Sequence, residues 1–325
     1  MRNSKKILLT VVCIAVIALV IVAMDIILYP CTYTRNDVHS ATTQQHDVIL
    51  LGSSNGKMNI NPDTLVSGTD KTAFNLCAGG QYPVDSYYLA RLIMEKQDPK
   101  TIIFELDPGY IMTEKEKGNN YLLFFHEFPL SRSKLEYAAD TLMDCDFRSA
   151  FFPFYEYSLQ SELPRVADNL DQKLKGEYKI DNFKGKAQEY HENGWIEKYP
   201  VPKDKFPAFH PTLFDEAEIK ENSLKYVEKL ASLCKEKGVE FIAISTPLPG
   251  AVLQKEKESF DASADYFSEY FAKLGVPYYN FNREYSKAFP HASEIYVDYD
   301  GHMNGENAEK FSKTLGGILF SKENA

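Results

Sequence analysis

Short apolar runs with strand character alternate with helical patterns in two blocks of the sequence, and this alternation restricts the fold more than any other feature. The predicted strands are 48–51, 72–76, 101–106, 239–245 and 277–279. Helical spacing of apolar residues is found at 88–94, 219–237 and 262–274, and a last helix is predicted at about 306–320 with Asn304 as its cap. Strands separated by helices predict an α/β protein with a parallel sheet, helices on both faces and ligands at the carboxyl ends of the strands.

The segment from about 113 to 213 interrupts this alternation. It is rich in aromatic and charged residues and in proline, with short helical patches at 148–157 and 187–196. We interpret the segment as an inserted cap or lid, which would exclude water from a site at the strand ends. An irregular structural elaboration with no role at the site is the alternative interpretation.

The N-terminus has the pattern of a membrane-spanning signal anchor. Lys5 and Lys6 precede an uncharged apolar run, 7–24, which continues after Asp25 to Tyr29. Roughly 20 apolar residues span a bilayer, and the basic flank places the N-terminus in the cytoplasm. A cleaved signal peptide is the alternative, but the sequence after the run is a poor cleavage site. We therefore predict a cytoplasmic tip and transmembrane segment at 1–29, a polar linker at 30–45 and an extracytoplasmic domain at 46–325.

Charge and motif content exclude several classes of function. The formal net charge is -10 and no cluster of lysine or arginine is present, which argues against a nucleic-acid partner. The five cysteines are scattered and form no CxxC pair, so a metal site built from cysteines is not expected. The sequence contains no Walker loop, GxGxxG or HExxH motif, and we predict neither a cofactor nor a metal.

Polar residues with catalytic potential follow the strand ends. Gly52-Ser53-Ser54-Asn55 ends the first strand, where glycine permits a sharp turn that exposes the next side chain. A serine there becomes a nucleophile only when a base takes its proton. The alternative is that the serines and the asparagine merely cap the next segment. Gly79 and Gly80 follow the second strand, where a backbone N–H could approach a ligand as an oxyanion donor.

The segment 298–304, Asp-Tyr-Asp-Gly-His-Met-Asn, precedes the last helix. His302 is the side chain best suited to act as a base near neutral pH. Asp298 or Asp300 could orient it as the third member of a triad. A surface histidine beside an Asx turn is the alternative. The order of the serine, the aspartate and the histidine along the chain favours the catalytic interpretation of all these segments together.

These residues resemble the SGNH/GDSL hydrolase superfamily, which has a flavodoxin-like, three-layer α/β/α fold. The resemblance covers about 46–110 and 239–322 and leaves 113–213 unmatched. By position, Gly52-Ser53-Ser54 matches the Gly-Asp-Ser turn of the family, which implies that Ser54 is the nucleophile and that Ser53 replaces the aspartate. Gly80 matches the glycine of the oxyanion hole, with the N–H of Ser54 as a further donor. His302 matches the base.

The Gly-Ser-Ser turn and the N-terminal anchor resemble the envelope acyl-transfer branch, which includes teichoic-acid D-alanylation and alginate O-acetylation proteins. That resemblance implies a membrane-bound O-acyltransferase partner and a glycan or polyol acceptor. Two departures from the family are evident. No residue matches the third-block asparagine, because Glu105 to Tyr110 lies at that strand end, so Asp107 or Tyr110 is expected to line the site. The spacing of the acid also differs, and Asp300 is preferred to Asp298 because the alginate-type proteins use Asp-x-His.

We therefore predict a membrane-anchored extracytoplasmic serine esterase or O-acyltransferase that acts through an acyl-serine. Its predicted catalytic residues are Ser54, His302 and Asp300, its oxyanion donors are Ser54 and Gly80, and Ser53, Asn55, Asp107 and Asp298 are expected to line the site. A non-catalytic binding or assembly protein that kept the fold is the alternative. A secreted lipase or carbohydrate esterase that acts alone is a further possibility.

Overall fold

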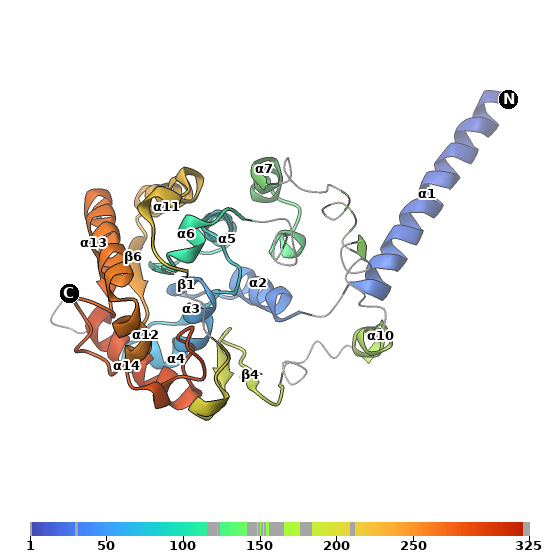
Figure 1. Ribbon diagram of the computed structural model, residues 1–325. Coiled ribbons are helices and arrows are strands. Elements are labelled where there is room, and N and C mark those ends of the chain that lie inside the picture. Colours follow the sequence, from blue (N-terminus) through green and yellow to red (C-terminus); the bar gives the residue numbers. More distant parts are fainter. Residues whose placement is uncertain are drawn as a thin grey trace.

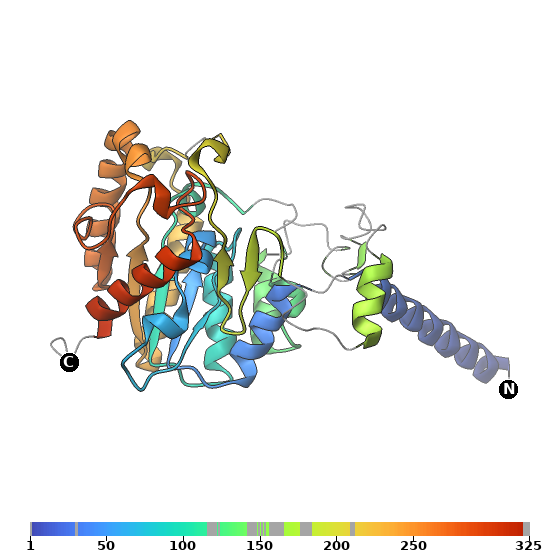
Figure 2. The same ribbon diagram turned by 90° about the horizontal axis from the view of Figure 1, so that it is seen from below.

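The computed structural model describes residues 2–29, 32–115, 122, 124–141, 148, 150, 152, 154–155, 166–175, 184–208 and 212–320. These residues form a layered α/β body from which the long N-terminal helix projects (Figure 1). A view turned by 90° shows the C-terminal helix, in red, lying across the strands (Figure 2).

A five-stranded parallel sheet forms the centre of the body. Its strands are β1 (Val48–Gly52), β2 (Ala73–Asn75), β3 (Thr101–Glu105), β6 (Glu240–Ser245) and β7 (Tyr278–Asn280). They lie in the order β2-β1-β3-β6-β7, and every pairing is parallel. This is the flavodoxin-like doubly wound order, in which ligands bind where the strand order reverses, between the first and third strands. The predicted strands and the predicted fold class are confirmed.

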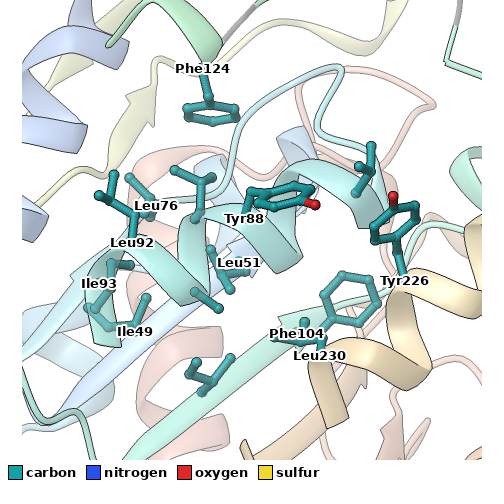
Figure 3. Close-up of a cluster of buried hydrophobic side chains, with 14 of the residues drawn as sticks. Ile49, Leu51, Leu76, Tyr88, Leu92, Ile93, Phe104, Phe124, Tyr226 and Leu230 are labelled. Atoms are coloured by element: carbon teal, nitrogen blue, oxygen red, sulfur yellow. The ribbon is translucent and has the colours of Figure 1, made fainter. Parts of the chain in front are cut away.

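Helices cover both faces of the sheet. One face carries α2 (Tyr33–Thr43), α5 (Pro83–Met94), α11 (Glu221–Lys237) and α13 (Lys257–Leu274), and the other carries α3 (Ser54–Asn59), α4 (Pro62–Leu65) and α14 (Gly305–Phe320). Because side chains alternate along a strand, Ile49 and Leu51 enter the first core while Val48 and Leu50 enter the second. Figure 3 shows the first core, where Tyr88, Leu92 and Leu230 pack over the strands.

The remaining helices among the described residues, apart from α1, are short. They are α6 (Gly109–Met112), α7 (Arg132–Thr141), α10 (Val166–Lys175), α12 (Gly250–Lys255) and the 3-10 turns η1 (Phe125–Glu127), η5 (Lys203–Lys205), η6 (Glu216–Glu218) and η7 (Ser293–Ile295). Asn304 caps α14 as predicted, since its side chain accepts a hydrogen bond from the N–H of Asn307 at 3.1 Å.

The N-terminal helix α1 (Arg2–Leu28) is apolar along most of its length. Its segment Ser4–Leu28 is, among the residues that the structure describes, the one helix long and apolar enough to cross a membrane. Large apolar side chains along it, from Ile7 to Ile26, are exposed. The helix therefore has the length and composition of a membrane anchor or of a signal sequence.

Helix α2 replaces most of the predicted linker. Its buried residues are Thr34, Asp37, Val38, Ser40 and Ala41. Asp37 forms a buried ion pair with Lys57 of α3, with Nζ and Oδ2 2.6 Å apart, and accepts a hydrogen bond from the hydroxyl of Tyr190 at 2.6 Å. The prediction of a linker is wrong for 33–43, because these polar side chains find partners inside the domain instead of in water.

The described parts of the insertion pack against the body. Residues 188–198 form an antiparallel hairpin, β4 (Gln188–Tyr190) and β5 (Ile196–Lys198), so the helical patch predicted at 187–196 is wrong. The carbonyl of Asn193 accepts a hydrogen bond from the N–H of Asn75, which covers the outer edge of β2. Helix α7 packs on α5, where the rings of Tyr137 and Tyr88 stack 4.8 Å apart. Much of the patch predicted at 148–157 lies outside the described residues.

Candidate active site

The turn after β1 depends on a glycine at position 52. Gly52 has φ 143°, which side chains rarely permit, and a Cβ there would lie 2.4 Å from the carbonyl oxygen of Glu105. Glycine therefore lets β1 approach the end of β3 and turn sharply. The turn places Ser53 at the N-cap of α3, where its Oγ accepts from the N–H of Asn55, and makes Ser54 the first residue of that helix.

A hydrogen-bonded chain joins Ser54, His302 and Asp298. Ser54 Oγ lies 2.8 Å from His302 Nε2, and His302 Nδ1 lies 2.7 Å from Asp298 Oδ2. The backbone N–H of His302 also donates to Asp298 Oδ1, at 3.1 Å. This is the geometry of a nucleophile, a base and an orienting acid. The structure thus brings the predicted Ser54 and His302 together.

The preference for Asp300 as the partner of His302 is contradicted by this geometry. Gly301, with φ 97°, turns the chain between Asp300 and His302. The turn brings the carboxylate of Asp298, four residues earlier, under the ring, while Asp300 is exposed and offers its backbone oxygen to the side chain of Asn55. Asp298, predicted only to line the site, is therefore the carboxylate that orients His302.

Two asparagines of α3 hold the histidine loop in place. Asn59 donates from Nδ2 to the carbonyl of Gly301 at 2.9 Å and accepts at Oδ1 from the N–H of Met303 at 2.8 Å, on either side of His302. Asn55 donates from Nδ2 to the carbonyl of Asp300 at 3.2 Å. Sequence reasoning missed the role of Asn59. The spacing of Asn55 and Asn59 was an available signal, because residues four apart share one face of a helix.

The electrostatics of the site favour an ionised Asp298. Partial burial opposes ionisation, but the hydrogen bonds and the charge of His302 outweigh it, and the pKa of Asp298 is lowered. Burial and the nearby charge of Asp298 together raise the pKa of Asp300. The two carboxylates therefore differ in the way expected when only one of them is paired with the imidazole.

Glu105, at the end of β3, lies under the nucleophile turn. Its Oε2 accepts hydrogen bonds from the backbone N–H of Ser53 at 2.9 Å and from Ser53 Oγ at 2.7 Å. Burial and the nearby Asp107 raise the pKa of Glu105 to about 7, although its hydrogen bonds to Ser53 and Gly56 oppose the shift. Ser53 thus supports the turn, because its hydroxyl bonds to Glu105 and to the N–H of Asn55.

The predicted oxyanion donor Gly80 already has a partner. Its N–H donates to the hydroxyl of Tyr110 at 2.8 Å. Gly79 lies beside the nucleophile, since a Cβ added to it would be 3.5 Å from the Cβ of Ser54. Tyr110 belongs to α6, directly after β3, and burial raises its pKa to about 12. A phenol that stays protonated at neutral pH therefore holds the N–H that was predicted to be an oxyanion donor.

A cavity of about 290 Å³ opens beside Ser54 and His302. Its walls come from the ends of β3, β6 and β7 and from α13, and include Asp107, Thr212, Phe214, Ser245, Ser263 and Asn280. Asn55 and Asp300 also line it, together with the buried Glu105. Among the lining residues that the structure describes, none is a lysine or an arginine. Burial raises the pKa of Asp107, although the backbone N–H of Gly109 and the charge of His302 oppose the shift.

Asp298, Asp300 and His302 also offer oxygen and nitrogen atoms within 4.8 Å of one another, which is a spacing that a metal ion could use. Both ring nitrogens of His302, however, already form hydrogen bonds, to Asp298 and to Ser54. A metal ion on this group would have to break one of these contacts, so the arrangement fits proton transfer better than metal binding.

Comparisons with known proteins place few constraints on this site. No family model matches the sequence, and no curated protein matches it significantly. Among solved structures, the crystal structure of a "putative acylhydrolase" from Bacteroides fragilis is similar, with 10% sequence identity and a TM-score of 0.40. The similarity covers 89% of this chain and 95% of that chain. So distant a similarity carries no functional assignment, which depends instead on the geometry of the residues themselves.

Proposed function

We propose that this chain is a membrane-anchored serine esterase or O-acyltransferase of the SGNH type. The observation that carries the proposal is the chain Ser54–His302–Asp298, with contacts of 2.8 and 2.7 Å, at the mouth of a cavity. It lies at the carboxyl end of β1, beside the point where the strand order reverses. The order of these residues along the chain and the parallel sheet order support the resemblance to the SGNH/GDSL superfamily that the sequence indicates.

In this mechanism, Ser54 Oγ attacks the carbonyl carbon of an ester while His302 Nε2 takes its proton. Asp298 accepts from Nδ1–H, which leaves Nε2 free as the base and stabilises the imidazolium that forms. The ester C–O bond then breaks, His302 returns the proton to the departing alcohol, and an acyl-Ser54 remains. In the second half, water or an acceptor hydroxyl attacks that acyl group while His302 takes its proton. The acyl–Ser54 bond then breaks, and His302 returns the proton to Ser54 Oγ.

Charge at the cavity supports an uncharged hydroxyl compound as the acceptor. Asp107 and Asp300 line the cavity, and no described lining residue is a lysine or an arginine that would attract an anion. A hydroxyl of an envelope glycan or polyol fits this environment better than a phosphate or carboxylate does. An apolar α1 that spans the membrane would hold the catalytic domain near such polymers, with a membrane-bound O-acyltransferase as the partner that delivers the acyl group.

The oxyanion donors in this proposal are the N–H of Ser54 and the hydroxyl of Tyr110. Tyr110 accepts from the N–H of Gly80 and keeps its own proton to donate. We expect Tyr110→Phe to lower kcat for an aryl acetate by about 10²- to 10³-fold with little change in KM, the loss typical of one oxyanion donor. The matched control is Tyr82→Phe, which removes a neighbouring phenol hydroxyl. The Tyr82 ring packs edge-on against Tyr110, with their ring centroids 4.8 Å apart. Unchanged or higher activity in Tyr110→Phe would mean that Tyr110 only covers the Gly80 donor.

A serine-reactive fluorophosphonate provides the test of the proposed function. The full chain, purified in detergent, is expected to react with the probe. At alkaline pH, the Ser53→Ala variant is expected to keep this reaction, whereas Ser54→Ala is expected to lose it. Equal labelling of wild type and Ser54→Ala would overturn the proposal. Absence of labelling in folded wild type would favour the alternative of a non-catalytic binding or assembly protein.

A further inference from the structure

We propose that Glu105 is a positioning residue that holds the nucleophile turn, and that the site requires its ionised carboxylate. The inference rests on the proposed role of Ser54. Glu105 touches no reacting atom in the mechanism above. It acts through the turn that fixes the Oγ and the N–H of Ser54.

The sheet register places Glu105 under this turn. Glu105 is the residue of β3 that pairs with Gly52 of β1, and only 2% of its surface is exposed. Gly56, in the first turn of α3, packs against the Glu105 side chain, because a Cβ added to Gly56 would lie 3.1 Å from the Cβ of Glu105. Glu105 therefore contacts both the start of the turn and the first turn of α3.

The hydrogen bonds require an acceptor at Glu105. Ser53 Oγ accepts from the N–H of Asn55, so its own proton points to Glu105 Oε2, which also accepts from the N–H of Ser53. The backbone of Gly56 adds another favourable hydrogen bond to the carboxylate. An ionised carboxylate can only accept, whereas a protonated one places an O–H among these donors. Protonation of Glu105 should therefore weaken the hydrogen bonds that hold the turn and the position of Ser54.

Burial and the nearby carboxylate of Asp107 make the protonation of Glu105 sensitive to pH near neutrality. Asp107 on the same strand end, Cys77 after β2, Tyr110 on α6 and Tyr278 on β7 all interact with it electrostatically. Lys57, the buried cation of the same helix as Ser54, is paired with Asp37. Burial and Asp107 thus outweigh the hydrogen bonds and raise the pKa of Glu105 from 4.5 to about 7.

The first test follows the second-order rate of fluorophosphonate labelling against pH in the full chain. Wild type should lose reactivity as the pH falls through about 7. Ser53→Ala removes one hydrogen bond to the carboxylate, which should raise the pKa of Glu105 further and move this loss to higher pH by about one unit. The reactivity of this variant should recover at alkaline pH. His302 is unchanged in both proteins, so its own titration does not produce the difference.

Asn61→Ala is the matched control. Asn61 caps α4 as Ser53 caps α3, by accepting from the backbone N–H of Asp63, but it does not contact Glu105. The control should keep the wild-type pH profile. A profile that shifts equally in Ser53→Ala and Asn61→Ala, or in neither, would overturn the role of Glu105. Failure of wild type to label at Ser54 would instead overturn the proposed function, so the two failures are distinguishable.

Glu105→Gln adds a readout that does not depend on activity. A raised pKa in the folded state stabilises the protein below the unfolded value of 4.5, and this stabilisation is lost as pH rises through about 7. The variant cannot ionise, so its Tm relative to wild type should rise between these pH values and be highest above them. At pH 8 the same variant should label about 10- to 100-fold more slowly, the cost of one or two hydrogen bonds to a charged group. A Tm difference that does not rise between these pH values, or a variant that labels like wild type at pH 8, would contradict the inference.

Discussion

Asp298→Asn is expected to lower the turnover of an aryl acetate ester by about 10³- to 10⁴-fold, while Asp300→Asn should stay within about threefold of wild type. The reason is the hydrogen bond of 2.7 Å from His302 Nδ1 to Asp298 Oδ2. An asparagine can turn its NH₂ toward the ring, which favours the tautomer with the proton on Nε2, and that nitrogen can then no longer act as the base. Asp300 contacts this network only through its backbone oxygen, which the substitution leaves in place.

The measurement is kcat for both variants at the same pH, with Tm as the control for folding. An equal loss in both variants would mean that the two carboxylates share the role. A larger loss in Asp300→Asn would restore the original preference for that residue and contradict the geometry of the site.

The second large effect is expected at the buried ion pair between α2 and α3. Lys57 and Asp37 have side chains that are each only 1% exposed, with Nζ and Oδ2 2.6 Å apart. Removing one partner leaves an uncompensated buried charge, which typically costs about 3–5 kcal/mol. We therefore expect Asp37→Leu and Lys57→Met each to lower the free energy of unfolding by about that amount.

The double variant Asp37→Leu/Lys57→Met should recover much of this loss, because it leaves no unpaired charge. Chemical denaturation of the full chain in detergent checks this expectation, with the two single variants as the comparison. Additive losses in the double variant would show that the two charges are not coupled as a pair. Single losses below about 0.5 kcal/mol would show that α2 is only loosely attached. In that case 33–43 would behave as the linker that its composition suggests.

Helix α2 also shows why composition alone placed the start of the domain too late, at residue 46. Its buried positions include Thr34, Asp37 and Ser40, and few apolar side chains mark its inner face. Its stability depends on Lys57 and Tyr190, which are distant in the sequence. Hydrophobic periodicity cannot reveal a helix whose buried face is polar. What stabilises such a helix is its pairs with residues far away in the sequence, and these cannot be recognised from the sequence of the helix itself.

The strands were predictable because their signals are local, whereas Ser54 and His302 were singled out together through their order along the chain and the resemblance to the SGNH/GDSL superfamily. Each strand is an apolar run that ends at turn residues, and a buried parallel sheet needs little else. The roles of Asp298 and Glu105 are different. The first depends on the positive φ of Gly301, and the second depends on the pairing of Gly52 with Glu105 across two strands. Neither can be read from spacing along the chain.

The hairpin at 188–198 was predictable in part. Asn193-Gly194 is a strong turn signal, and Gly194 has φ 84° with no room for a Cβ beside the carbonyl of Asn75. A helical interpretation of 187–196 does not take this dipeptide into account. Its contact with the edge of β2, by contrast, could be found only from the fold.

The measurement that tests the central claim most directly is the detection of an acyl-serine. Full-chain protein mixed with an aryl acetate and quenched early should carry one acetyl group, and peptide mass analysis should place it on Ser54. Ser53→Ala should form the same adduct and Ser54→Ala should form none. An acetyl group on Ser53, or an adduct of equal yield in Ser54→Ala, would contradict the assignment of Ser54 as the nucleophile.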